Sequence, residues 1–207
     1  NVSVHRDWLL FELQDDWTVN EVTYTSGSLV ATNYKRWMKG KRDLTTLFAP
    51  TAESSLAGFS FTKNHLVLNI LEHVKNKLIV RTPPTKGKGD WSKATIAGLP
   101  EFGTVSAWPL DAETSDDMWF SATDYLSPSS LWYGTIGETP KPLKETPAWF
   151  NADNLTVSQH FATSKDGTKV PYFQVSRKDM PLDGSSRTLL YGYGGFEISL
   201  LPSYNPR

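Results

Sequence analysis

Short apolar, β-prone segments separated by polar turns recur about every ten residues through roughly the first 145 residues of the chain. Leu66 to Leu71 and Lys77 to Arg81 are two such segments, with the polar stretch His73 to Asn76 between them. This spacing predicts an antiparallel all-β array, with one short helical turn at 34–39 that Gly40 ends. We expect strands at residues 8–13, 17–22, 28–32, 44–48, 57–62, 66–71, 77–81, 91–96, 104–108, 118–123 and 131–136.

These strands group into two or three units of about four strands and about 40 residues each. A unit of this size matches one blade of a β-propeller. A free-standing β-sandwich made from the same strands is the alternative that the spacing leaves open. The eight Trp, eight Tyr and ten Phe residues favour strands over helices in either case.

The pattern changes in the last third of the chain. Residues 138–148 hold three prolines among polar residues, so we expect an exit loop there and place a domain boundary near Trp149. Beyond it, residues 156–163 alternate in polarity like a half-buried strand, and Asp166-Gly167 is a strong two-residue hairpin signal. Residues 168–176 then provide the returning strand of a hairpin.

A buried strand is also expected at residues 187–191, and it leads into a run of glycines and aromatic residues, Tyr191 to Phe196. Glycine adopts backbone angles that other residues avoid, so a strand entering such a run can bend sharply. A hydroxyl on a turn at the end of a buried strand is well placed to donate to a developing negative charge. Tyr193 is therefore a candidate donor, and a structural turn capped by packed aromatic rings is the alternative.

Several short motifs in the C-terminal part agree in order and spacing with one known family. They are Ser-Lys-Asp-Gly-Thr-Lys-Val-Pro at 164–171, Leu-Asp-Gly at 182–184, the run at 191–196, Ile-Ser at 198–199 and Pro-Ser-Tyr-Asn at 202–205. Together they resemble the prolyl oligopeptidase family of serine peptidases, at the point where its α/β-hydrolase domain begins. Residues 66–80 and 120–133 are similar to the later blades of that family's β-propeller.

The resemblance implies a mainly β fold with two parts. Residues 1–148 would form late, four-stranded antiparallel blades of a partial propeller, and residues 149–207 the N-terminal part of the α/β-hydrolase (peptidase) domain. In this family a serine is activated by a histidine that an aspartate orients, and a tyrosine hydroxyl helps to hold the oxyanion. The resemblance assigns that hydroxyl to Tyr193. It also assigns Phe196 to the apolar pocket for the substrate proline, with a plain core residue as the alternative.

The motif that carries the nucleophile, Gly-x-Ser-x-Gly, occurs nowhere in the 207 residues. In the family, the serine, aspartate and histidine all follow the segment that holds the tyrosine. We therefore expect an internal fragment that is inactive alone, whose partners are the remaining parts of the same protein and short proline-containing peptides, with no cofactor. Two alternatives stay open: an oligopeptidase B-like enzyme that cuts after basic residues, and a non-catalytic β-propeller binding module.

Composition argues against several other classes of protein. A net charge of −1 favours neither nucleic acid nor an anionic membrane surface, and no stretch reaches the ~18 apolar residues of a membrane span. There are no cysteines and the four histidines are widely separated, so we expect no metal site. Asp15-Asp16 and Asp116-Asp117 are expected in solvated turns. We expect a cytoplasmic protein, with periplasmic or secreted locations as alternatives.

Overall fold

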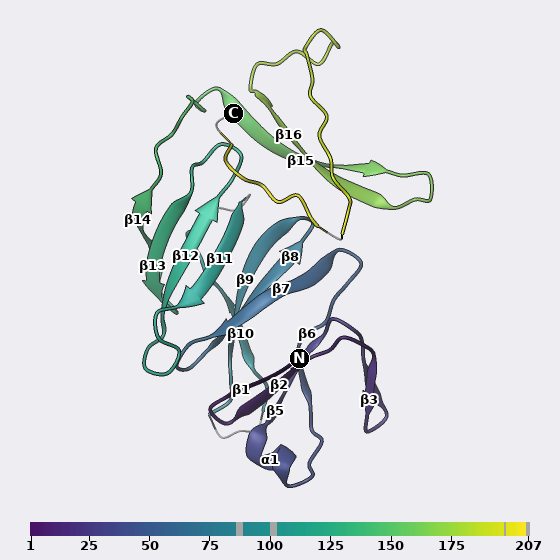
Figure 1. Ribbon diagram of the computed structural model, residues 1–207, viewed down its shortest axis with the longest axis vertical. Coiled ribbons are helices and arrows are strands. Elements are labelled where there is room, and N and C mark those ends of the chain that lie inside the picture. Colours follow the sequence, from purple (N-terminus) through teal and green to yellow (C-terminus); the bar gives the residue numbers. More distant parts are fainter. Residues whose placement is uncertain (86–88, 100–102, 197, 206–207) are drawn as a thin grey trace.

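The computed structural model describes residues 1–85, 89–99, 103–196 and 198–205, and nearly all of its regular structure is antiparallel β-sheet. Figure 1 shows three four-stranded sheets that follow one another along the chain, with a two-stranded hairpin beyond them. Among the described residues, the single helix is α1 (Tyr34–Met38), which Asn33 caps by accepting from the backbone N–H of Arg36. The prediction of an all-β fold with one helical turn is confirmed.

The first sheet has the strand order β1-β2-β5-β6, and a small separate hairpin is inserted between β2 and β5. Its edge strand β1 was not expected, because its residues alternate between exposed and half-buried and carry little apolar signal. The strands of this region are β1 (Val2–His5), β2 (Trp8–Glu12), β5 (Leu29–Asn33) and β6 (Thr45–Phe48), with β3 (Trp17–Val19) and β4 (Val22–Tyr24) in the inserted hairpin.

The second sheet has its strands in chain order, so each strand pairs with the next. It consists of β7 (Ser54–Phe61), β8 (Leu66–Glu72), β9 (Lys75–Thr82) and β10 (Ser92–Thr95). The turn between β8 and β9 is tight, and both of its central residues, His73 and Val74, have positive φ angles of 50° and 64°. A β-branched residue rarely adopts that conformation, so this turn is strained.

The third sheet also follows chain order and corrects one expectation. Its strands are β11 (Thr104–Pro109), β12 (Asp117–Thr123), β13 (Ser130–Thr135) and β14 (Lys141–Glu145). We expected residues 138–148 to be a loop, whereas β14 is the outer strand of this sheet. Pro142 is tolerated there because β14 is the edge strand of the sheet. In addition, Pro142 lies opposite Trp132, next to a shift in register.

The core lies between the sheets, and the second sheet contributes to it with both faces. Leu66 and Leu68 of β8 pack in a cluster with the first sheet, while Val67 between them packs in a cluster with the third sheet. Alternate residues of a strand point to opposite faces, so a strand covered on both sides requires a continuous apolar run. This packing of successive four-stranded sheets is that of propeller blades and not of a two-sheet sandwich.

The hairpin of β15 (Leu155–Thr163) and β16 (Lys169–Arg177) agrees with the strands and the turn position expected from the sequence. Gly167 takes a positive φ of 89° in the turn, but the loop is longer than the two-residue turn expected, because the backbone N–H of Ser164 donates to the carbonyl oxygen of Thr168 and leaves residues 165–167 between them. The buried strand expected at 187–191 is wrong for this structure. That segment pairs with no strand of the described chain, and Leu189 and Leu190 are 91% and 93% exposed.

Candidate functional site

Tyr193 lies in an irregular stretch where its ring folds back over a neighbouring glycine. A Cβ atom built on Gly195 would lie 2.7 Å from the Tyr193 hydroxyl oxygen and 3.0 Å from its Cζ atom. Only glycine permits so close an approach, so Gly195 allows this ring position. Phe196 follows with a positive φ of 55°, which is uncommon for a residue with a side chain.

The two residues assigned to the catalytic site are exposed in this structure. The side chain of Tyr193 is 50% exposed and that of Phe196 is 92% exposed. Among the described residues, neither side chain lines the cavity of about 570 Å³ or either of two cavities of about 250 Å³. The oxyanion role of Tyr193 and the pocket role of Phe196 therefore stay predictions.

The segment that follows Phe196 is anchored on the third sheet. Pro202 is fully buried, and its carbonyl oxygen accepts a hydrogen bond of 2.6 Å from the hydroxyl of Thr104 at the start of β11. The hydroxyl of Tyr204 accepts from the backbone N–H of Trp149 at 2.7 Å, and its ring stacks on Phe150 at 4.8 Å. In the sequence, these residues served only as family markers, yet they hold the end of the chain against the sheet.

The hairpin β15–β16 rests on the ends of the second and third sheets on the same side of the molecule (Figure 1). The side-chain amide of Gln159 donates to the carbonyl oxygen of His73 at 2.6 Å, and Phe161 meets the His73 ring edge to face at 5.0 Å. Phe173 contacts Tyr125 of the third sheet at 5.4 Å, and burial raises the pKa of Tyr125. The strained turn of the second sheet is thus one of the hairpin's contact points.

At the opposite ends of the same sheets, Asp116 joins the second sheet to the third. Its carboxylate accepts 2.7 Å hydrogen bonds from the hydroxyl of Thr62 and from both the backbone and side-chain amides of Asn64. Burial alone would raise the pKa of Asp116, but these hydrogen bonds and the nearby His65 outweigh it and hold the pKa below its usual value.

The expectation that Asp116 lies in a solvated turn is therefore wrong. Its side chain is only 17% exposed, and its oxygen lies 3.9 Å from Nε2 of His65. The turn that places Asp116 is local, but its partners come from residues more than 50 positions earlier. No pattern around Asp116 could have shown these contacts.

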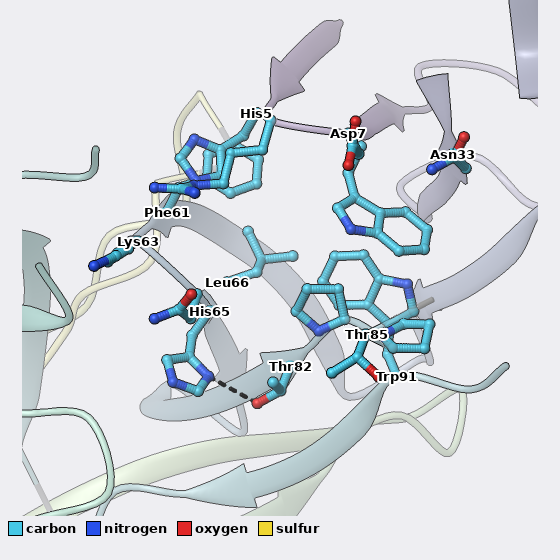
Figure 2. A pocket seen from close by; sticks show the side chains of 15 residues that line it. His5, Asp7, Asn33, Phe61, Lys63, His65, Leu66, Thr82, Thr85 and Trp91 are labelled. Carbon is cyan, nitrogen blue, oxygen red and sulfur yellow. Dashed lines mark hydrogen bonds between the residues drawn. The ribbon is translucent and has the colours of Figure 1, made fainter. Parts of the chain in front are cut away.

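A cavity of about 570 Å³ lies between the first and second sheets, at the same ends as Asp116. Figure 2 shows His5 and Phe61 on one side of it and Trp91 on another, with Leu66 between them. His65 also lines it, and one of its ring nitrogens, Nδ1, forms a 2.7 Å hydrogen bond with Thr82, drawn as the dashed line.

Across the described residues, there is no group of three or more His, Cys, Asp or Glu side chains placed to hold a metal ion. The described part of the chain also contains no helix that is long and apolar enough to cross a membrane.

Comparison with known proteins gives relatives over nearly the whole chain. The uncharacterized peptidase y4nA of Sinorhizobium fredii is 41% identical over 201 residues, which is 95% of this chain and 27% of that protein. Prolyl endopeptidase of Elizabethkingia miricola is 34% identical over 108 residues, 52% of this chain and 15% of that enzyme. The structure of a post-proline cleaving enzyme from Rickettsia typhi matches 99% of this chain and 30% of its own, with a TM-score of 0.79 and 25% identity.

The chain belongs to the prolyl oligopeptidase family. The match to a solved prolyl oligopeptidase family enzyme covers the three sheets and the hairpin together, so the sheets are propeller blades of that family. The chain spans about three tenths of the length of the relatives that it matches end to end. No family model matches it.

Proposed function

We propose that the chain is part of a serine endopeptidase that hydrolyses short peptides on the carboxyl side of proline. The observation that carries this proposal is the match of 99% of the chain to a post-proline cleaving enzyme, at a TM-score of 0.79. The proposal divides the chain at residue 148, with propeller blades before it that restrict access to small peptides. Residues 149–207 would then contribute to the peptidase domain.

In this proposal Tyr193 donates a hydrogen bond to the oxyanion of the tetrahedral intermediate. A phenol is a neutral donor at pH 7, and a ring held in place before the reaction needs no reorganisation during it. The hydrogen bonds of Pro202 to Thr104 and of Tyr204 to Thr123, both residues of the third blade, support a fixed position for the segment that follows Tyr193. Phe196 would line the pocket that receives the proline ring.

The nucleophile, base and orienting acid would come from other parts of the full-length protein, because the chain has no Gly-x-Ser-x-Gly motif. The same parts would cover the exposed apolar side chains of Leu189, Leu190 and Phe196. Acyl transfer needs a nucleophile and a base, so this chain alone should show no turnover. We place the full-length enzyme in the cytoplasm, which cell fractionation would test.

The proposal is tested by turnover of a chromogenic Gly-Pro amide by the full-length protein, as wild type and as Tyr193→Phe. Loss of one oxyanion donor should lower kcat by about 10²–10³ and leave KM nearly unchanged. Tyr191→Phe is the matched control, since it removes a phenol from the same run with no assigned role.

The results of this experiment distinguish the proposed function from its alternatives. An active enzyme whose turnover is unaffected by Tyr193→Phe would remove Tyr193 from the mechanism. Cleavage of an arginine amide with none of the Gly-Pro amide would replace proline specificity by that of an oligopeptidase B. No turnover of either would favour a non-catalytic propeller.

A further inference from the structure

We propose that the cavity between the first and second blades is a second peptide site, which binds the carboxylate end of a short peptide that terminates in proline. This inference rests on the proposed function, since post-proline cleavage releases peptides with such an end. The cavity is separate from the proposed site that holds Tyr193.

The cavity is far from the side of the molecule that carries the β15–β16 hairpin. Leu66, at the start of β8, lines it, whereas His73, just beyond the end of β8, contacts the β15–β16 hairpin. The seven residues of β8 span roughly 20 Å at the rise of a β-strand. The cavity therefore lies on the opposite face of the propeller from the hairpin.

The walls of the cavity are built from paired rings. Trp8 and Trp91 meet edge to face at 4.8 Å, and the rings of His5 and Phe61 stack at 4.5 Å with an angle of 16°. Figure 2 shows the His5–Phe61 pair across the cavity from Trp91. Rings fixed by such contacts suit a rigid, flat apolar group, and proline is recognised on aromatic surfaces of this kind. The volume of about 570 Å³ is within the range of small-ligand sites.

The charges around the cavity favour an anion. Arg6 and Lys63 both line it, and Arg6 donates to the backbone carbonyl of Glu113 at 2.6 Å, which leaves its charge uncompensated by that contact. Within the described part of the chain, neither cation has a carboxylate within 4.0 Å, and the ion pairs of lysine and arginine involve Lys35, Arg36, Lys77 and Arg177.

Two of the carboxylates near the cavity, Asp7 and Asp116, are engaged by other partners. Asp7 is the one carboxylate among the described residues that line the cavity, and it pairs with Lys35 at 3.2 Å. Asp116 accepts hydrogen bonds from Thr62 and Asn64, whereas the carboxylate of Glu113 is 74% exposed and faces water, with Nδ1 of His5 at 3.8 Å. A ligand carboxylate would thus complement Arg6 and Lys63.

One buried donor in the wall has no acceptor. Trp91 is 7% exposed, and its indole nitrogen makes no hydrogen bond in the structure. Buried N–H groups are normally paired, and an orphan needs an explanation. A carbonyl oxygen of a bound peptide, reached after a small shift of the ring, would supply the acceptor.

The test measures binding by calorimetry to the full-length protein whose proposed peptidase site has been blocked with a serine-directed organophosphate. The probes are N-acetyl-Gly-Pro with a free carboxylate and the corresponding amide, which differ only in charge. We expect one acid bound per chain and the amide to bind about tenfold more weakly, because charge-assisted hydrogen bonds to the carboxylate are lost. Lys63→Gln should weaken the acid about three- to tenfold and leave the amide unchanged.

Lys141→Gln is the matched control, since it removes the same charge from the exposed edge strand β14 and should change nothing. Equal binding of acid and amide, equal effects of the two lysine variants, or no binding to the blocked protein would each overturn the inference. Failure of the proposed function would appear separately, as absent turnover and absent reaction with the organophosphate. Binding of the acid can then still be measured on the unreacted protein.

Discussion

Two runs of this chain that contain leucines, β8 and residues 187–191, have opposite environments. Leu66, Val67 and Leu68 in β8 are each at most 2% exposed, whereas Leu189 and Leu190 are over 90% exposed. The difference lies in what surrounds each run. β8 pairs with β7 on one edge and β9 on the other, and neighbouring blades cover both of its faces. Residues 187–191 have neither paired edges nor covered faces among the described residues.

An apolar run therefore specifies a strand only together with its neighbours, because β-propensity is mostly a measure of packing on a pleated surface. The β8 run receives those neighbours from blades close in sequence. Under the proposed function, the 187–191 run receives them from the rest of the peptidase domain. The exposed leucines then mark an interface within one protein and not a surface that faces water.

The largest expected effect comes from truncating one leucine in each run. Leu68→Ala should lower the free energy of unfolding of the chain by about 2–5 kcal/mol, because it leaves a cavity between the blades. Leu190→Ala should change it by less than about 0.5 kcal/mol, because that side chain is already in water. Urea unfolding followed by tryptophan fluorescence measures both.

Repeating the pair in the full-length protein sharpens the comparison. If the peptidase domain covers residue 190, Leu190→Ala should become costly there while Leu68→Ala keeps its effect. An equal and small effect of Leu190→Ala in both proteins would mean that the run stays exposed. It would also remove the argument that these leucines belong to a covered strand.

A smaller effect on stability is expected at two aspartates with lowered pKa values, one between two blades and one in the C-terminal hairpin. Asp116 joins two blades, while Asp166 lies exposed at the tip of the hairpin, where Ser164 and the backbone N–H of Thr168 lower its pKa to about 2. Asp116→Asn should cost about 1–3 kcal/mol, because an amide cannot accept all three hydrogen bonds. Asp166→Asn makes the same substitution at an exposed position and serves as the comparison.

The sign of the pH dependence follows from the lowered pKa of Asp116. Its contribution to stability is complete above the unfolded pKa of about 3.9 and is lost as the pH falls through the lower folded value. Unfolding curves between neutral pH and pH 3 should therefore show a weaker acid dependence for Asp116→Asn than for wild type. Parallel curves would mean that Asp116 carries no such linkage.

The sequence was informative where contacts are local and weak where they are distant. The position of the turn at Asp166-Gly167 and the β8–β9 pair depend on neighbours in sequence, and both were expected correctly, although the turn is longer than two residues. The strand β14 was missed because Pro142 normally argues against a strand, and only its edge position next to a register shift makes it acceptable. Asp116 was misjudged because its donors come from another blade.

The candidate site follows the same rule. The sequence located Tyr193 through a motif, but the position of its ring depends on a glycine two residues later. The anchoring of Tyr204 on Trp149 joins residues 55 positions apart, which no local pattern shows. The sequence proposes which residues form the site, an assignment that stays a prediction, and it does not show how those residues are held.

The smallest expected effect on stability tests how Tyr193 is held. Gly195→Ala should change the free energy of unfolding by less than about 0.5 kcal/mol, since this stretch packs against little else. It should nevertheless displace the ring, because the new methyl group would lie 2.7 Å from the hydroxyl oxygen. In the wild type, the Tyr193 ring protons should show nuclear Overhauser contacts to the α-protons of Gly195, and these should be lost in the variant. If the contacts persist and the new methyl resonance is shifted by the ring, the loop accommodates alanine. In that case Gly195 does not determine the position of the Tyr193 phenol. The site would then not differ from the blades in depending on a glycine for the placement of a side chain.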